Sequence, residues 1–127
     1  MLDALNFPTY TPRSSIHVYQ PGDVALLNVG EAGARVVFDC GPLRTWAFHI
    51  DQEGTATWPA SAIVRMEISN CLTMWTTFPA ATLPASITAE GFGDLVDVAG
   101  IRYISLAVTT VHATNPKNLL VCGWGEP

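Results

Sequence analysis

Apolar and polar side chains alternate with a period of two residues along several stretches of the chain. Residues 61–69 are the clearest case, since Val64, Met66 and Ile68 fall on one face and Arg65 on the other. Period two is typical of a β-strand that buries one face. The alternation predicts strands at 35–40, 44–51, 61–69, 82–89 and 101–110.

Shorter segments of the same kind lie between these strands and complete an all-β pattern. We expect further strands at 15–19, 24–29, 55–58, 73–78, 95–98 and 119–124. Gly, Pro and Asn residues separate the segments, and the run from Gly91 to Gly93 is interpreted as a turn. No window shows a capped helical pattern. About eight to ten short strands predict one domain over residues 1–127, an antiparallel β-sandwich or jelly roll.

The first thirteen residues lack this periodicity. Phe7 and Tyr10 alternate there with prolines and threonines. A segment that is apolar but too short for its own core must pack elsewhere, so residues 1–13 are predicted to form an extended N-terminal arm. The sequence leaves open whether the arm crosses its own sandwich or a neighbouring subunit.

Composition narrows the possible surroundings of such a fold. Only 13% of the residues are charged and 49% are hydrophobic, whereas soluble domains carry about 25% charged residues. The uncharged run 71–89 is broken by threonines and prolines, and a membrane-spanning helix needs roughly 20 mainly apolar residues. A net charge of −5 with a single lysine disfavours nucleic acid as a partner. We therefore expect a subunit whose surface is partly covered by other proteins.

The chain begins without the basic and apolar regions of a secretory signal, which indicates synthesis in the cytoplasm. Cys40, Cys71 and Cys122 are odd in number and form no C-x-x-C pair, so buried, reduced thiols are expected. The three histidines show no metal-ligand spacing. We expect no cofactor and no metal.

Candidate catalytic groups are few. His49 and Asp51 share a strand face and could form a dyad with a distant serine, although no nucleophile motif accompanies them. A pair of carboxylates suited to glycoside hydrolysis could come from Glu67, Glu90, Asp94 and Asp97. We expect a non-enzymatic protein and keep a hydrolase as a third hypothesis.

The four tryptophans divide into two pairs. Trp46 shares the parity of apolar neighbours, as does Trp124, so both are expected in the core. Trp58 and Trp75 lie near strand ends and are the better candidates for a contact surface. Exposed aromatic rings suit both glycans and proteins as partners.

Segment 101–110 offers a second candidate surface. Tyr103, Ser105, Ala107 and Thr109 form a small, uncharged face that could lie flat against a neighbouring protein. Arg102, just before them, is expected either to form an ion pair with Asp97 or to contact the partner.

Four pieces of sequence resemble the small β-sandwich virion proteins of tailed bacteriophages. They are Ile68-Ser69-Asn70, Trp75-Thr76-Thr77, Ile87-Thr88-Ala89-Glu90-Gly91 and the strand from Val98 to Thr110, so that the resemblance extends over a stretch of about 45 residues, Ser69 to Thr110. Two positions depart from that pattern: Cys71-Leu72-Thr73 stands in place of an Asp-Gly turn, and Glu90 in place of Asp.

The resemblance implies a structural role in the virion, as a capsid decoration or cement protein or as a tail-associated subunit, with no catalytic residues. It implies capsid or tail subunits as partners, together with self-association into a homo-oligomer. The alternative is a carbohydrate-binding module of a phage adhesin that uses Trp58 and Trp75.

Overall fold

The computed structural model describes residues 16–53, 62–78, 91–92, 95–111 and 118–127, and in these ranges the chain forms strands and turns without a helix. The predicted strands 55–58 and 82–89 and the N-terminal arm lie outside the described residues. The strands are β2 (Val18–Tyr19), β3 (Ala25–Asn28), β4 (Arg35–Asp39), β5 (Thr45–Gln52), β6 (Ile63–Ser69), β7 (Thr76–Thr77), β8 (Gly91–Phe92), β9 (Val96–Asp97), β10 (Tyr103–Thr110) and β11 (Asn118–Trp124).

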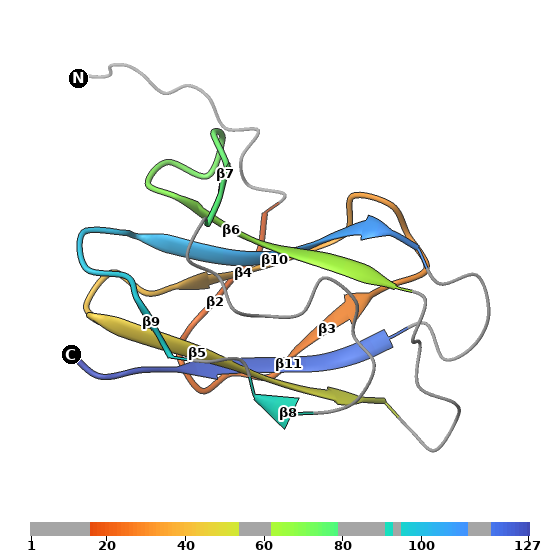
Figure 1. Cartoon of the computed structure of the whole chain (residues 1–127), viewed down its shortest axis with the longest axis horizontal. Coiled ribbons are helices and arrows are strands. Elements are labelled where there is room, and N and C mark those ends of the chain that lie inside the picture. The colour runs from red at the N-terminus through yellow and green to blue at the C-terminus, as the bar shows by residue number, and fades with distance from the viewer. Residues whose placement is uncertain (1–15, 54–61, 79–90, 93–94, 112–117) are drawn as a thin grey trace, which may run out of the picture.

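These strands form two sheets, as the sequence predicts, in the manner of a β-sandwich (Figure 1). The first sheet has the order β2-β4-β10-β6-β7, and the second has the order β3-β11-β5-β8, with β9 also pairing with β5. Pairing is antiparallel except between β2 and β4, which run parallel, so the prediction of a wholly antiparallel sandwich is wrong at this edge. The turn predicted at Gly91 also differs, because Gly91–Phe92 is strand β8, paired with β5.

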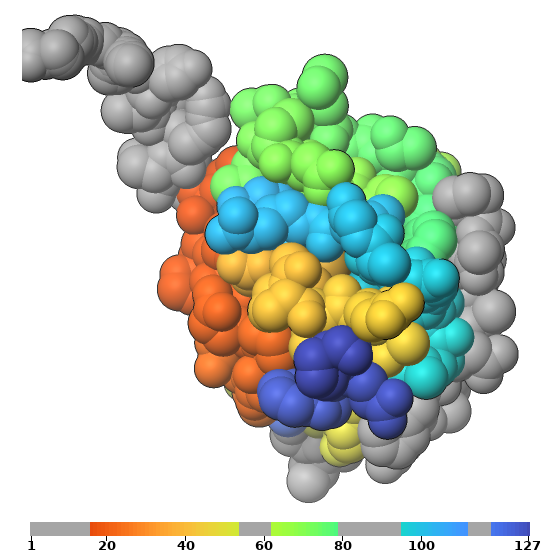
Figure 2. Space-filling model, turned by 90° about the vertical axis from the view of Figure 1, so that its left-hand side faces the viewer, coloured from red at the N-terminus to blue at the C-terminus, as the bar shows by residue number. Residues whose placement is uncertain are grey.

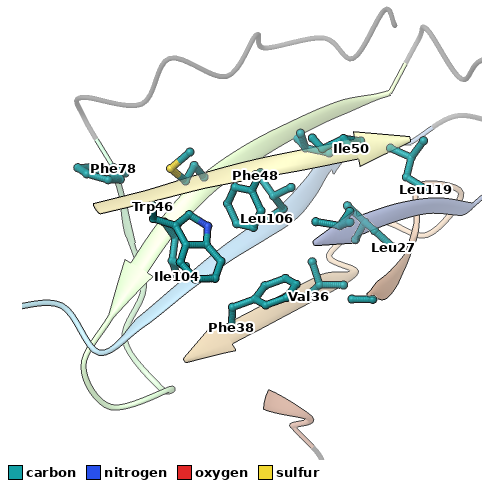
Figure 3. Close-up of a cluster of buried hydrophobic side chains, with 14 of the residues drawn as sticks. Leu27, Val36, Phe38, Trp46, Phe48, Ile50, Phe78, Ile104, Leu106 and Leu119 are labelled. Carbon is teal, nitrogen blue, oxygen red and sulfur yellow. The ribbon is translucent and has the colours of Figure 1, made fainter. Parts of the chain in front are cut away.

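The core lies between the sheets and is built from the inward parity of each long strand (Figure 3). Phe38, Trp46 and Phe48 meet at its centre, with ring centroids 5.5 to 5.8 Å apart. Tilted and edge-to-face contacts at these distances are favourable for aromatic rings. Trp46 is fully buried, which confirms the expectation for that residue.

Trp124 is 62% exposed, so its expected place in the core is wrong. Strand β11 points Leu119, Val121 and Gly123 inward and its other parity outward. A Cβ atom on Gly123 would overlap the indole ring of Trp46. The Trp46 ring thus fills the core at this end of β11, and the next residue, Trp124, faces solvent.

Backbone hydrogen bonds hold the C-terminal residues against the start of β5. The N–H groups of Arg44 and Thr45 donate to the carbonyl of Glu126, and the Glu126 N–H donates to Thr45 Oγ1 at 2.9 Å. Figure 2 views this end of the sandwich, where the C-terminal residues (dark blue) lie against the yellow segment. These bonds fix the chain just after Trp124 and so hold this residue in place at the end of β11.

The turn before β10 is held by Asn70, at the end of β6. Asn70 Oδ1 accepts from the Arg102 N–H at 2.7 Å, and Asn70 Nδ2 donates to the Gly100 carbonyl at 3.4 Å. The Arg102 guanidinium pairs with Asp39 at 3.1 and 3.2 Å. The expected ion pair with Asp97 is therefore wrong, because β4 lies beside β10 and brings Asp39 within reach.

In the described part of the chain, no helix has the length and hydropathy needed to cross a membrane.

Candidate functional site

The outer face of the first sheet is arranged in rows across β4, β10 and β6. Ser105 lies between Val37 and Glu67, and the next row places Ala107 between two arginines, Arg35 and Arg65. Directly opposite residues of antiparallel strands share a face and approach within about 5 Å. Two small residues on the central strand are therefore flanked by larger side chains from both neighbouring strands.

Arg35 covers the centre of this face. Its Nη1 donates to Ser105 Oγ at 3.1 Å, and its Nη2 lies 2.7 Å from Glu67 Oε1. Its Cζ lies 4.3 Å from the centroid of the Trp75 ring, in a cation–π contact. We call Arg35, Glu67, Trp75 and Ser105 the arginine cluster. The Arg35 side chain can reach from β4 to β6 because the β10 residues beneath it, Ser105 and Ala107, are small.

The arginine cluster corrects the expectation of a flat, uncharged docking face. Ser105 is fully buried and Ala107 is 5% exposed, so neither offers contact area to a partner. Tyr103 is half-buried, with the Arg102 guanidinium 5.1 Å from its ring centroid, and Thr109 is exposed. Trp75 is half-buried, and its ring is in contact with Arg35. The other candidate contact residues, Phe7, Tyr10 and Trp58, lie outside the described residues.

The outer face of the second sheet has the opposite character. Four large apolar side chains on or beside it are exposed: Val24 (61%), Leu26 (50%), Leu95 (60%) and Trp124 (62%). The residues with which they share this face are half-buried or exposed, namely Ala47, His49, Leu120 and Cys122. We call these eight residues the apolar face. Contiguous exposed apolar surface on a soluble chain is typical of a contact site.

Two adjoining hollows follow the apolar face. The larger, of about 430 Å³, is lined by Gly22, Ala47, Leu95, Gly123 and Trp124, among others. The smaller, of about 170 Å³, is lined by Val24, Asp51 and Leu120, among others. His49 and Cys122 line both hollows and stand directly opposite each other on β5 and β11. The two hollows thus form one groove along the sheet, with the Trp124 side chain at its larger end.

Two acidic side chains line the groove. Glu126 lines the larger hollow and Asp51 the smaller, while Asp23 immediately precedes Val24. Arg44, just before β5, is the one basic residue in the described strands and adjoining turns of this sheet. On the first sheet, by contrast, both Glu67 and Asp39 are paired with arginines. The groove therefore favours partners that combine apolar side chains with positive charge.

The candidate catalytic groups within the described residues are divided between the two sheets. His49 and Asp51 do share the outer face of β5, and the Asp51 carboxylate accepts from the Gln52 N–H at 2.8 Å. Among the expected acids, Glu67 is bound to Arg35 on the first sheet. Asp97 lies on β9 beside the second sheet, where it accepts from the Ala99 N–H. Glu90 and Asp94 lie outside the described residues.

The three cysteines, all within the described residues, are free thiols in three different environments. Cys40 is buried as expected, and burial, with the nearby Asp39 carboxylate, raises the pKa of its thiol to about 12. Cys71 is exposed, contrary to expectation. Hydrogen bonds from Thr73, Met74 and Ser69 lower the pKa of its thiol to about 7. Cys122 is half-buried in the groove.

Within the described ranges, no three His, Cys, Asp or Glu side chains are grouped so as to hold a metal ion. Comparison of the chain with protein-family models, with curated proteins and with solved structures gives no match. We therefore assign the groove on the apolar face as the candidate functional site, because of its exposed apolar side chains and its shape.

Proposed function

We propose that this protein is a non-enzymatic structural subunit that works by burying its apolar face against other proteins. The observation that supports this proposal is the exposure of Val24, Leu26, Leu95 and Trp124 around one groove. Large exposed apolar patches are uncommon on soluble domains that stay monomeric, and they are typical of protein–protein contact sites.

The proposal includes a place in the particle of a tailed bacteriophage, as a capsid decoration or tail-associated subunit. It is supported by the resemblance of the pieces between Ile68 and Thr110 to small virion proteins. The partners are then capsid or tail subunits and further copies of the chain, with synthesis in the host cytoplasm. The genes adjacent to the coding sequence test this part, because capsid or tail genes are expected beside it and a metabolic operon would contradict it.

The proposal also includes the finer fold, a jelly roll with an extended arm at residues 1–13. Consecutive strands β2 to β6 alternate between the two sheets, as jelly-roll strands commonly do.

The energy available from the apolar face favours assembly in an array. Full burial of one large apolar side chain contributes about 1.5–3 kcal/mol, so four half-exposed side chains contribute about 3–6 kcal/mol in all. Association of two proteins costs an estimated 4–15 kcal/mol. One such contact is therefore weak, and the subunit binds firmly where several contacts form together, as on an assembled shell.

Sedimentation velocity tests the contact face. The wild-type chain is expected to self-associate with rising concentration, and Leu26→Lys is expected to weaken association at least tenfold. Met74→Lys is the matched control, because Met74 is 73% exposed but lies on the turn after β6. A wild-type chain that stays monomeric at high concentration, or equal effects of the two lysines, would contradict the proposal.

Glycan binding is the second candidate function, now supported by Trp124 in place of Trp75. The Trp124 ring is exposed beside the polar groups of His49 and Glu126, whereas Trp75 is in contact with Arg35. Binding on a glycan array that Trp124→Ala abolishes would favour this function over the protein contact.

A further inference from the structure

The segment before Ile16 lies outside the described residues. That segment holds Leu2, Leu5, Phe7 and Tyr10, which are apolar side chains of the kind that the groove accepts. Its charged side chains are Asp3 and Arg13, and from Ala4 onward Arg13 is the single one, whereas the groove is lined by the carboxylates of Glu126 and Asp51. The segment therefore complements the groove in its apolar side chains, and its part from Ala4 onward does so in charge as well.

We infer that residues 1–13 of one copy bind in the apolar groove of a second copy. This inference rests on the proposed function and specifies its contact: the occupant of the apolar face is a segment of the same chain. Each subunit then provides one arm and one groove. Because arm and groove are different surfaces, the contact is heterologous, and repetition gives a ring or an open chain unless two copies exchange arms reciprocally.

The direction of β2 favours a second copy over the chain's own groove. β2 runs parallel to β4 at the edge of the first sheet, and the chain continues from Tyr19 to Gly22, which lines the groove. Val18 thus lies on the first sheet, whereas the groove opens on the outer face of the second sheet. To reach it, the segment would have to reverse direction, yet it contains Pro8 and Pro12 and no glycine. Proline and the residue before it favour extended backbone.

The length of the segment is sufficient for exchange. Extended chain covers about 3.3 Å per residue, so the fifteen residues before Ile16 span about 50 Å. The six steps from Tyr10 to Ile16 cover about 20 Å of that, enough to leave one sandwich before the apolar residues begin. The apolar part of the arm is thus free to lie along a groove on a neighbour.

A native thiol makes the inference directly testable in the full chain. Cys122 lies at the junction of the two hollows. A second thiol is introduced in the arm by Thr9→Cys, in a Cys71→Ser background that removes the exposed, reactive cysteine. Oxidation with copper phenanthroline, which accepts the two electrons, is expected to form a disulfide between position 9 and Cys122. Mixed unlabelled and ¹⁵N-labelled chains are expected to yield linked peptides of mixed isotope composition.

A matched control moves the acceptor thiol to the other sheet. In Cys122→Ser with Thr109→Cys, the acceptor is an exposed position on the outer face of the first sheet, and linking is expected to fall at least tenfold. Equal linking in this control, or links within single chains only, would overturn the inference. Phe7→Ser combined with Tyr10→Ser is expected to weaken self-association at least tenfold.

The inference and the proposed function fail in different ways. If Leu26→Lys abolishes self-association while the arm variants leave it unchanged and no link forms, the groove contacts another surface, and only the arm is overturned. If the wild-type chain does not associate at all, the proposed function fails and the arm inference fails with it.

Discussion

The two outer faces of the sandwich differ in the size of the side chains on their central strands, and in whether side chains of the neighbouring strands cover them. On the first sheet, β10 presents Ser105 and Ala107, and the long side chain of Arg35 extends over them to reach Glu67. On the second sheet, β11 presents Leu120, Cys122 and Trp124, and Trp124 remains 62% exposed. Small central residues allow a face to be covered from within the chain, whereas large apolar ones leave it for a partner.

The largest expected difference between the faces is in the response to a lysine. Ala107→Lys places a large cation on a buried position between Arg35 and Arg65, so we expect the free energy of unfolding to fall by about 3 kcal/mol. Leu26→Lys replaces a half-exposed side chain and is expected to change it by less than about 0.5 kcal/mol. Urea denaturation followed by circular dichroism measures both.

The comparison of the faces fails if these two lysines have equal effects on unfolding. Ala107→Ser is the control for Ala107→Lys, because it adds one small atom without charge. It is expected to stay close to wild type.

The second difference concerns the arginine cluster itself. Arg35→Met keeps most of the aliphatic stem but removes the ion pair with Glu67, whose side chain is 13% exposed, and the contact with the Trp75 ring. We expect a loss of about 2 kcal/mol in the free energy of unfolding, because a largely buried carboxylate loses its partner. Glu67→Gln in the Arg35→Met background is expected to recover part of the loss. A double-mutant cycle without coupling would show that the cluster does not act as a unit.

The sequence predicts the strands. Where a strand carries apolar residues at both its odd and its even positions, however, the sequence does not predict which set faces outward. In 61–69, one parity is charged, and the inward face was predicted correctly from Val64 and Met66. In 119–124 both parities are apolar, so alternation alone could not place Trp124. Its position depends on Trp46, a residue 78 positions earlier, whose ring occupies the space at Gly123.

The same limit applies to the candidate site. The small residues of 103–109 were correctly read as one strand face, yet their burial depends on Arg35, which lies 70 positions away from Ser105. A signal for the real apolar face was present, because 24–29 and 119–124 both carry apolar residues on their outward parity. Strands that are apolar on both faces indicate cover on both faces.

Thiol reactivity gives a third, smaller contrast between the two sheets. The pKa of Cys71, at the end of the first sheet, is lowered to about 7, so its thiolate forms as pH rises through 7. Since the thiolate is the nucleophile, the labelling rate with iodoacetamide is expected to rise with an inflection near pH 7. Thr73→Val removes the side-chain hydrogen bond to Cys71 and is expected to move the inflection toward the ordinary value of 9 and to slow labelling about tenfold at pH 7.

Cys122 is expected to respond to assembly instead. Because it lines the groove, its labelling should fall as protein concentration and association rise, while labelling of Cys71 should not. Cys40, buried and with its pKa raised to about 12, should react only after unfolding. Parallel protection of Cys71 and Cys122 would show that the contact is not confined to the apolar face.

The smallest expected effect separates two residues at the turn before β10. Asn70→Ala removes two hydrogen bonds to the backbone of this turn, at Arg102 N–H and the Gly100 carbonyl, and is expected to cost about 1 kcal/mol in the free energy of unfolding. Arg102→Ala removes an exposed ion pair with Asp39 but leaves the backbone bonds in place, so its urea midpoint should coincide with that of wild type. If Arg102→Ala proved the more destabilising of the two, the ion pair and not Asn70 would hold the turn, and the first sheet would depend on surface charge at its end as well as at its centre.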